Sequence, residues 1–323
     1  MTLTCCLMVL NYNGRRHLDD CFSTLLVAAA RSRHDCRVVC VDNLSTEPDV
    51  AYLRARFPEV EVIVAAENDF LFSLNPIVAR RTEDVVVILN NDMRFDADFV
   101  DPLIAHFSDP TLFAAAAQLT NWEGDTRQNA ARRGWVHNAW FYKGWRGDGQ
   151  QAAASIEAPG GASAYHRQRF AELGGFDPLF RPGYYEDFDL SYRAWLRGWS
   201  TVFEPRSIIH HKEGMTMDGV FGRGRITRVH FRNHVLFTVK NIGGWQFLCA
   251  FLALLPLRAM RPMLHGDFMP ICGIAAAVSR LGPALRARHA RPRGTSSSLV
   301  FDRIEGWRAG EHQHAADISG AAS

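Results

Sequence analysis

A run of five aliphatic residues, 85–89, ends at Asn90-Asn91-Asp92 and limits the possible folds of this chain more than any other segment. Such a run is typical of a strand buried on both faces, as in a parallel sheet covered by helices. Ligands bind in open α/β sheets at the carboxyl ends of strands, where these polar side chains are expected. A carboxylate there can hold Mg²⁺ or Mn²⁺, which prefer oxygen ligands. Asn-Asn-Asp is equally typical of a simple turn, and this segment alone leaves both interpretations open.

Strand and helix patterns alternate along the first 120 residues. Predicted strands at 7–10, 38–41 and 60–64 are separated or followed by apolar residues at helical spacing in 18–29 and 50–57. Polar residues repeatedly follow the predicted strands. This recurrence predicts an α/β fold with a mostly parallel sheet and right-handed crossovers.

Composition places the chain among ordinary globular proteins. It has 323 residues, enough for one large α/β domain with an extension or for two modest domains, and 47% are hydrophobic and 22% charged. The formal net charge of +2 gives no reason to expect nucleic acid as a partner. Seven cysteines, several of them in apolar segments, predict buried thiols in a reducing compartment. The apolar residues 1–10 lack a basic region and a cleavage site, and predict a first strand, not a signal peptide.

Residues 121–155 show no clear period and carry several tryptophans and arginines. They predict a long connection without secondary structure of its own, which is usually functional or mobile. Aromatic and guanidinium groups suit sugar faces or phosphates. Tryptophans that only pack the connection onto the domain are an equally acceptable interpretation.

Three acids, Glu186, Asp187 and Asp189, fall in the first turn of a helix that the spacing of apolar residues predicts and that Gly198 is placed to end. Acids in the first turn of a helix interact favourably with the helix dipole, and this effect explains the presence of one or two of the three acids. Crowded carboxylates raise one another's pKa, which suits proton abstraction. A later apolar segment leads to His210-His211, and a histidine beside a metal-binding carboxylate is a plausible further ligand.

Six motifs, in this order, resemble those of family 2 glycosyltransferases with the GT-A fold, nearest to the bacterial rhamnosyl- and galactofuranosyl-transferase-like group. The motifs are Asn11-Tyr12-Asn13-Gly14, Asp42-Asn43-x-Ser45-Thr46, Leu89-Asn90-Asn91-Asp92, Gly174-Gly175-Phe176-Asp177, Tyr185-Glu186-Asp187-x-Asp189-Leu190 and His211. The resemblance covers residues 3–240. It implies a Rossmann-like, mostly parallel central sheet flanked by helices, Mg²⁺ or Mn²⁺, and a UDP- or dTDP-sugar donor.

The resemblance also implies roles for single residues. Asp187 matches the catalytic base, with Glu186 beside it. Asp92 and His211 match metal ligands, and His210 is an extra histidine. Nucleotide-sugar contacts are implied for Asn11, Tyr12, Asn13, Asp42 (to the base), Asn43, Ser45, Asn68, Asn90 and Asn91, and acceptor contacts for Gly161, Tyr184, Tyr185 and Asp189.

Three positions depart from the family pattern. Asn90 stands where the first acid of the metal motif is expected, which removes one charge from the site. Residues 68–75 lack the glycines usual in the family, which places the local nucleotide contacts in question. Leu44 replaces a common glycine, so its backbone is expected to avoid positive φ.

The last third of the chain is expected to form a helical extension. Residues 245–257 are apolar nearly all round but too short to span a membrane. Residues 258–293 carry seven arginines and the single acid Asp267, which suits a face lying on an anionic membrane. A helical lid buried on the catalytic domain is the alternative. Residues beyond 294 predict a disordered tail. The expected division is 1–215, 216–293 and 294–323.

These features together predict an inverting, metal-dependent glycosyltransferase that builds a surface polysaccharide or glycolipid on a glycan or lipid-linked acceptor. We expect it in the cytoplasm, peripherally bound to the inner face of the cell membrane. A non-catalytic protein that binds nucleotide sugars is the main alternative, because Asn90 and the missing glycines depart from the pattern. A sugar nucleotidyltransferase is disfavoured, because no glycine-rich basic phosphate loop is evident after the first strand.

Overall fold

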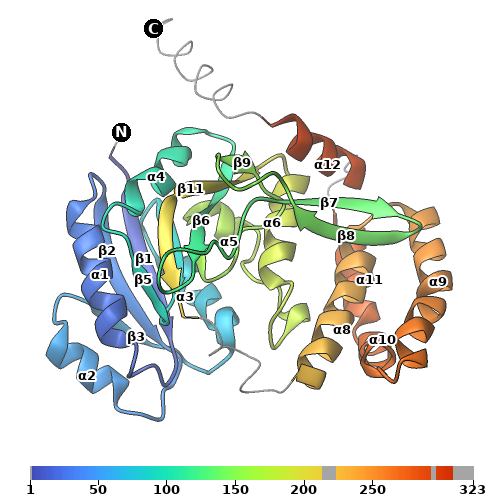
Figure 1. The fold of residues 1–323 in the computed structure, drawn as a ribbon, viewed down its shortest axis with the longest axis horizontal. Helices are drawn as coiled ribbons and strands as arrows, with labels where there is room; N and C mark the ends of the chain where they lie inside the picture. The colour runs from blue at the N-terminus through green and yellow to red at the C-terminus, as the bar shows by residue number, and fades with distance from the viewer. Residues whose placement is uncertain (1, 213–222, 292–295, 308–323) are drawn as a thin grey trace, which may run out of the picture.

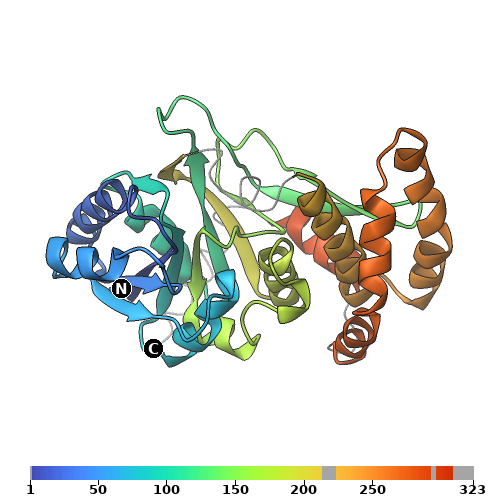
Figure 2. The same cartoon turned by 90° about the horizontal axis from the view of Figure 1, so that it is seen from below.

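The computed structural model describes residues 2–212, 223–291 and 296–307, and these residues form a sheet domain joined to a helical extension (Figure 1). The described part of the chain contains a nine-stranded sheet in the order β3-β2-β1-β4-β10-β6-β11-β5, with β9 paired to β11. Figure 2 shows the sheet domain on the left and the extension on the right. The predicted α/β architecture with a helical carboxyl-terminal region is confirmed.

The first half of the sheet domain alternates strands and helices. Its elements are β1 (Thr4–Asn11), α1 (Leu18–Arg31), β2 (Asp35–Asp42), α2 (Asp49–Arg56), β3 (Glu61–Val64), η1 (Phe70–Ser73), α3 (Leu74–Arg80), β4 (Val85–Asn90), β5 (Met93–Phe95), α4 (Val100–Ala105) and η2 (His106–Ser108). Strands β1 to β4 pair in parallel. Asn11 is opposite Asp42 and Leu10 is opposite Asn90, so the polar carboxyl ends of three strands meet at one edge.

The second half of the sheet domain completes the sheet with mixed pairing. Its elements are β6 (Leu112–Thr120), β7 (Arg132–His137), β8 (Trp140–Trp145), β9 (Ala153–Ala154), β10 (Ala162–His166), α5 (Arg167–Glu172), η3 (Pro178–Phe180), α6 (Glu186–Leu196) and β11 (Ser200–His211). Strand β10 runs antiparallel to β4 and β6, and β11 runs parallel to β6. The antiparallel pairing of β5 with the end of β11 brings Met93 opposite His211, next to the Asn-Asn-Asp segment.

The central strands are buried on both faces, as their sequences predict. Cys5, Leu7 and Val9 pack with α1 and α4 on one face, whereas Cys6 and Met8 pack with α3, α5 and α6 on the other. Residues 85–89 are at most 1% exposed. Because successive side chains of a strand point to opposite faces, an unbroken apolar run requires a core on each side.

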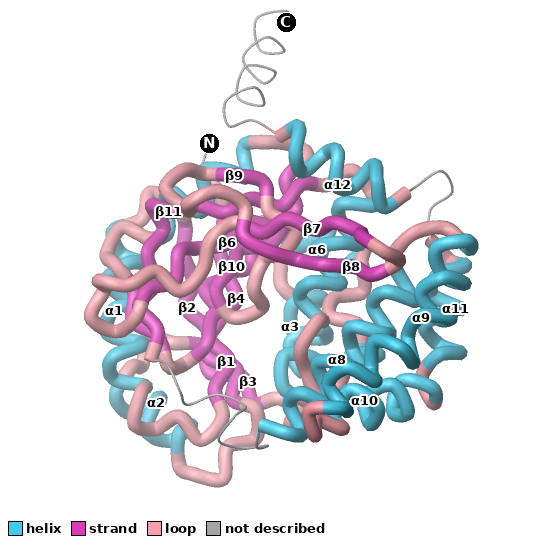
Figure 3. Tube along the Cα trace, turned by 45° about the vertical axis from the view of Figure 1, so that its right-hand side comes forward, coloured by secondary structure: helices cyan, strands magenta, loops and turns pink. Residues whose placement is uncertain are grey.

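The prediction that residues 121–155 lack secondary structure is wrong. Strands β7 and β8 form a separate two-stranded hairpin that extends from the sheet domain over to the helical extension (Figure 3). Buried Phe141 packs against Phe188 at a centroid distance of 5.6 Å, and Trp135 stacks on Tyr142. Cross-strand aromatic pairs of this kind stabilise a hairpin without the apolar alternation that identifies a strand in a sequence.

The extension contains α8 (Arg223–Asn241), α9 (Trp245–Leu264), α10 (Met269–Val278), α11 (Leu281–His289) and α12 (Ser297–Gly306). The prediction that the apolar segment is too short to span a membrane is wrong, because α9 continues past residue 257. Of the helices in the described residues, α9 alone is long and apolar enough to cross a membrane by length and composition. Four of its residues are nevertheless buried against the protein: Leu248, Phe251, Leu255 and Ala259.

Part of the predicted disordered tail is ordered. The Ser296 hydroxyl accepts a hydrogen bond from the Leu299 amide (3.1 Å), a helix N-cap that starts α12. Val300 and Ile304 are buried in the same core as α6. A capped helix with two apolar residues one turn apart can bury its face despite its polar neighbours. Residues 308–323, also predicted to be disordered, lie outside the described residues.

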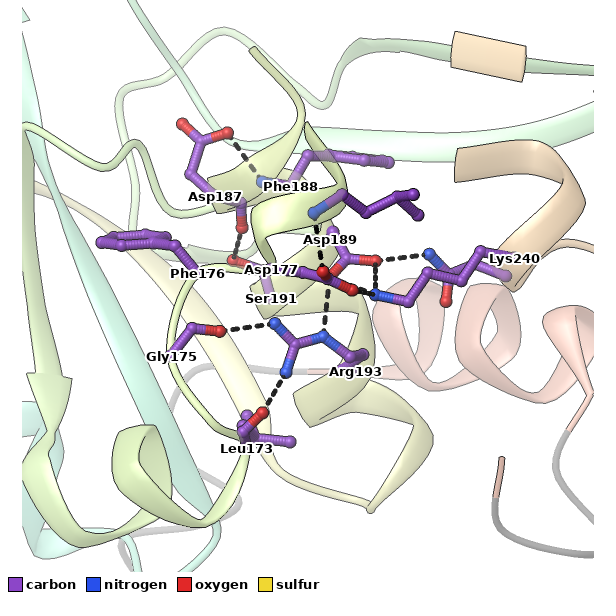
Figure 4. A network of polar contacts seen from close by, with 12 residues as sticks. Leu173, Gly175, Phe176, Asp177, Asp187, Phe188, Asp189, Ser191, Arg193 and Lys240 are labelled. Atoms are coloured by element: carbon purple, nitrogen blue, oxygen red, sulfur yellow. Dashed lines mark hydrogen bonds and ion pairs between the residues drawn. The ribbon is translucent and has the colours of Figure 1, made fainter. Parts of the chain in front are cut away.

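A buried ionic network joins the sheet domain to the extension (Figure 4). Asp189 of α6 is fully buried and accepts hydrogen bonds from Arg193 Nε (2.7 Å), Lys240 Nζ (2.8 Å) and Asn241 Nδ2 (2.7 Å). Lys240 also donates to Asp177 (2.6 Å). Burial raises the pKa of Asp189, but Lys240 and Arg193 outweigh burial, and the net pKa is below its ordinary value.

Asp189→Asn is expected to lower the free energy of unfolding by about 3–5 kcal/mol, because buried cations lose a fully enclosed partner. Since the folded-state pKa is depressed, this stabilisation is complete above about pH 4 and is lost as the pH falls below that value. Urea unfolding at pH 7 measures the change. Asp98→Asn removes the exposed pair with Arg31 (2.9 Å) and is the matched control, with an expected loss of at most about 1 kcal/mol. Equal losses of unfolding free energy in the two variants would contradict a stabilising role of the buried network around Asp189.

Candidate active site

A cavity of about 540 Å³ lies at the carboxyl ends of β1 and β4, between η1 and the loop before α6. Many of the residues singled out in the sequence line it together: Tyr12, Asn13, Asn43, Asn68, Asn90, Asn91, Asp92, Tyr184 and Glu186. They come from five separate segments of the chain. The structure therefore gathers most of the predicted nucleotide-sugar residues around one space.

Asn11, Asp42 and Ser45 do not line this cavity but lie behind it. Asp42 is 2% exposed and accepts hydrogen bonds from the Ser45 hydroxyl (2.6 Å) and from Asn11 Nδ2 (3.1 Å). Asn11 Oδ1 in turn accepts from Asn91 Nδ2 (2.7 Å). In this arrangement the three residues hold Asn91 in place from behind. The contact of Asp42 with a nucleotide base stays a prediction.

The backbone at Gly14 and Leu44 lies close to the hydrogen-bonded residues Asn11, Asp42 and Ser45. A Cβ atom at Gly14 would lie 2.0 Å from Asn91 Nδ2 and 2.3 Å from Asn11 Oδ1, so a larger residue would displace this hydrogen-bonded pair. The expectation that Leu44 avoids positive φ is wrong, since its φ is 61°. The turn is closed by the Ser45 amide, which donates to Asp42 (2.9 Å), and this bond holds Leu44 in the left-handed region with its side chain exposed.

Asp92 and His211 meet at the edge of the cavity. Asp92 Oδ2 is 3.4 Å from His211 Nε2, and the Lys212 amide donates to the Asp92 carbonyl (3.1 Å). Asp92 Oδ1 and His211 Nε2 are both buried and have no hydrogen-bond partner. Two atoms bound to one cation at about 2.1 Å and at right angles are about 3 Å apart, close to the observed spacing. The pair therefore fits a divalent cation.

The surroundings of the two histidines distinguish them. His211 Nδ1 is 3.2 Å from Gln128 Oε1, a contact that leaves Nε2 free to bind a metal. His210 points to the other side of β11, where its ring contacts Thr120 (3.0 Å) and Asp96 (2.8 Å). No group of three or more His, Cys, Asp or Glu side chains in the described residues is placed to hold a metal. A bound cation would thus take its remaining ligands from substrate oxygens and water, as Mg²⁺ commonly does.

Two basic residues of the cavity were missed in the sequence. Arg16 and His17 line the main cavity and also a second cavity of about 500 Å³ that includes His211 and Lys212. Burial, then Arg16 and Lys212, lower the pKa of His17. The sequence feature that could have identified them is the basic run Arg15-Arg16-His17, directly after the first strand and its Gly14 turn. The Arg16 guanidinium beside the metal pair suits a diphosphate, whereas the lowered pKa of His17 favours a neutral imidazole at neutral pH.

Asp187 and Glu186 adopt different positions at the start of α6. Asp187 is partly exposed, and its carboxylate accepts hydrogen bonds from the amides of Gly160 (3.1 Å) and Phe188 (2.7 Å). Glu186 is 6% exposed, lines the cavity, and has a buried Oε2 without a hydrogen-bond partner. In Figure 4, Asp187 lies at the end of α6 away from the cluster around Asp189.

The two carboxyl groups differ in acidity. Burial, then the nearby Glu157 carboxylate, raises the pKa of Asp187 to about 6. Burial and the Asp187 carboxylate raise the pKa of Glu186 to about 8. At neutral pH Asp187 is mostly ionised and can accept a proton, whereas Glu186 is mostly protonated and can donate a hydrogen bond. This contrast favours Asp187 as a general base.

The loop before α6 is held in a strained conformation by the extension. Tyr184 and Tyr185 have φ values of 67° and 76°, which are unfavourable for residues other than glycine. Asn233 of α8 is fully buried, and its amide donates to the carbonyls of Phe180 (3.0 Å), Gly183 (2.8 Å) and Tyr184 (2.7 Å). The extension thereby fixes the start of α6, where Glu186 and Asp187 lie.

The remaining predicted acceptor residues lie around the cavity without lining it. Gly161 lies against Asn90, where an added Cβ would be 2.4 Å from Asn90 Oδ1. The Tyr185 hydroxyl contacts His234 Nδ1 (2.9 Å). Asp189 is enclosed in the ionic network and is remote from solvent. Acceptor contacts for these residues stay predictions.

Comparison with known proteins gives the family. The model of glycosyl transferase family 2 matches residues 6–173. The chain belongs to this family. It is 26% identical over 208 residues to the pre-mycofactocin glycosyltransferase of Mycobacterium tuberculosis and 25% identical over 143 residues to a probable N-acetylgalactosaminyltransferase 9 of Caenorhabditis elegans. These matches cover 62% and 40% of this chain, but only 40% and 24% of the respective relatives.

Solved structures of similar fold include three transferases. GalNAc-T7 with UDP, GalNAc and Mn²⁺ aligns with a TM-score of 0.65 and 18% identity, over 99% of this chain and 58% of that one. TarS 1-349 of S. aureus with UDP-GlcNAc gives 0.58 and 13%, over 99% and 89%. The mannosyltransferase PcManGT of Pyrobaculum calidifontis with GDP-Man and Mn²⁺ gives 0.55 and 16%, over 100% and 80%. The predicted GT-A fold is confirmed.

Proposed function

We propose that this family 2 protein transfers a sugar, with inversion, from a nucleotide-diphosphate sugar to a hydroxyl group of a glycan or lipid-linked acceptor. The observation that carries the proposal is the pair Asp92 and His211. The two side chains approach to 3.4 Å, and each has a buried atom without a hydrogen-bond partner, beside a cavity that Arg16 also lines. UDP, UDP-GlcNAc and GDP-Man in structures of similar fold support a nucleotide-sugar donor, and we propose a UDP- or dTDP-sugar for this protein.

The donor is proposed to lie along the cavity with its diphosphate near Asp92, His211 and the basic residues Arg16 and His17. Mg²⁺ or Mn²⁺, when bound by Asp92 and His211, would stabilise the negative charge that develops on the leaving diphosphate. Neutral Asn90 and Asn91 add hydrogen-bonding capacity but no charge, so we propose that the Arg16 guanidinium supplies part of the electrostatic stabilisation.

The acceptor is proposed to approach from the side of Asp187. Its hydroxyl would donate a hydrogen bond to the ionised Asp187 carboxylate, which removes the proton as the oxygen attacks the anomeric carbon. The Gly160 and Phe188 amides fix this carboxylate in one orientation. Attack from the face opposite the diphosphate inverts the anomeric configuration. Surface polysaccharide or glycolipid synthesis in the cytoplasm is the setting that we propose for this reaction.

Donor turnover tests the proposal. A panel of nucleotide sugars is first screened by thermal shift, because a ligand that binds the folded state raises the melting temperature. Release of free nucleoside diphosphate is then measured with Mn²⁺, with Mg²⁺ and with a chelator. We expect slow release that needs a divalent cation. Donor binding without any release, in the presence of either metal, would favour the non-catalytic nucleotide-sugar-binding protein.

A further inference from the structure

The helical extension carries many exposed apolar side chains. Half of the exposed large hydrophobic side chains in the described part of the chain fall in α9, α10 and the turn between them. We call this surface the docking face; its members are Trp245, Leu252, Leu257, Met260, Leu264, Phe268, Ile271 and Val278. Leu264 is 78% exposed and Leu257 is 61% exposed. Apolar patches of this kind mark interaction sites more often than scattered exposed residues do.

Helix α9 has a covered side and an uncovered side, and both are apolar. The covered side packs on the protein through Leu248, Phe251 and Leu255, with the Phe251 ring 5.5 Å from that of Trp140. The uncovered side carries Leu257 and the other α9 members of the docking face. Packing within the described fold accounts for the first set only. The second set needs another partner or an apolar environment.

The charge around the docking face is strongly positive. Between residues 223 and 291 the sequence has ten arginines and Lys240, against the single acid Asp267. Arg232, Lys240 and Arg288 are buried. Among the described side chains of this range, the exposed cations are Arg225, Arg228, Arg261 and Arg286. Arg261 is exposed on α9 beside the apolar stripe. Arg258 of the same helix lies over the Trp140 ring (4.8 Å) and donates to the Asn138 carbonyl at the hairpin tip. An apolar face with cationic neighbours is complementary to a partner that has an apolar interior and anionic groups at its surface.

We propose that the docking face binds peripherally to an anionic phospholipid bilayer. The apolar side chains would enter the boundary between headgroups and acyl chains, and the arginines would contact the phosphates. Trp245, at the start of α9, suits this boundary because its ring is amphipathic. The proposal concerns a different part of the protein from the reaction proposed above and does not depend on it.

A second copy of the chain fits the docking face less well. A two-fold symmetric interface places the same patch on both sides, so the arginines of one copy would face those of the other. Asp267 is the only acid in this region that could offset them. A membrane-spanning position of α9 fits less well too, because four of its residues are packed on the protein and Arg258 is held at the hairpin tip.

Flotation with lipid vesicles tests the proposal on the full chain. Vesicles of phosphatidylcholine alone are compared with vesicles of equal parts phosphatidylcholine and phosphatidylglycerol. We expect flotation with the mixed vesicles, reduced by about 0.5 M salt. The double variant Leu257→Gln/Leu264→Gln should have a lower vesicle affinity, by at least about tenfold for each leucine replaced. Arg261→Gln should weaken binding about fivefold on mixed vesicles only.

The control is Val27→Gln with Val64→Gln, because both valines are exposed (52% and 48%) but lie on the sheet domain, in α1 and β3. This control should float like the unchanged protein. Melting temperature and donor binding of every variant are measured in parallel, and we expect them to be unchanged. Three results would overturn the proposal: no flotation of the unchanged protein, resistance to extraction by salt and alkali, or a dimer in solution that Leu257→Gln with Leu264→Gln converts to monomer.

Discussion

Asp187→Asn is expected to slow sugar transfer by about 10²–10⁴-fold, the usual range for the loss of a positioned general base. The substitution preserves the shape of the side chain, but its one amide oxygen can accept from only one of the Gly160 and Phe188 amides. It also removes the group that accepts the acceptor proton. Donor binding should remain nearly unchanged, because Asp187 does not line the donor cavity. The rate of nucleoside diphosphate release and donor affinity, measured on the same preparation, separate these two effects.

Glu186→Gln is the matched control for this prediction. Glu186 adjoins Asp187 and lines the cavity, yet its raised pKa keeps it protonated at neutral pH. An amide can replace a protonated carboxyl group as a hydrogen-bond donor, so we expect a smaller change that falls mainly on donor affinity. Near-normal turnover in Asp187→Asn, together with a collapse in Glu186→Gln, would identify Glu186 as the base.

Asp92→Ala is expected to abolish metal-dependent donor binding. Asp92 supplies the only carboxylate of the proposed metal pair, since the neutral Asn90 stands at the position of the other acid. His211→Ala should weaken metal binding by about 10–100-fold, because one ligand and its contact with Gln128 are lost. Loss of the electron paramagnetic resonance signal of free Mn²⁺ on titration with protein and UDP measures binding directly.

His210→Ala controls for the loss of a neighbouring imidazole. His210 lies on the opposite side of β11 and its two ring nitrogens contact Thr120 and Asp96. We therefore expect Mn²⁺ binding in this variant to match that of the unchanged protein. Unchanged Mn²⁺ binding in Asp92→Ala would instead rule out the metal assignment.

The parts of the fold that depend on local apolar pattern could be predicted from the sequence. The run at residues 85–89 identified a strand buried on both faces, and the polar residues after it identified the edge at which the cavity lies. The acids at the start of α6 were also evident. The resemblance assigned the base to Asp187. The difference in pKa between Glu186 and Asp187 could not be predicted, because it depends on burial and on neighbours such as Glu157, distant in sequence.

The parts that depend on tertiary contacts escaped prediction. The hairpin of β7 and β8 is held by aromatic contacts across the strands and to α6, which leave no apolar alternation in the sequence. Leu44 adopts positive φ because the hydrogen bond between Ser45 and Asp42 closes its turn. Asn233 is an ordinary polar residue in the sequence, and only the fold places it on the loop before α6.

The pH dependence of nucleoside diphosphate release, measured at saturating donor and Mn²⁺, tests most directly the claim that Asp187 is the base. Burial raises its pKa to about 6, and only the ionised form accepts a proton. The rate is therefore predicted to rise with pH through about pH 6 and then level off, and the rise should disappear in Asp187→Asn. A rise that survives in Asp187→Asn and disappears in Glu186→Gln would contradict the account.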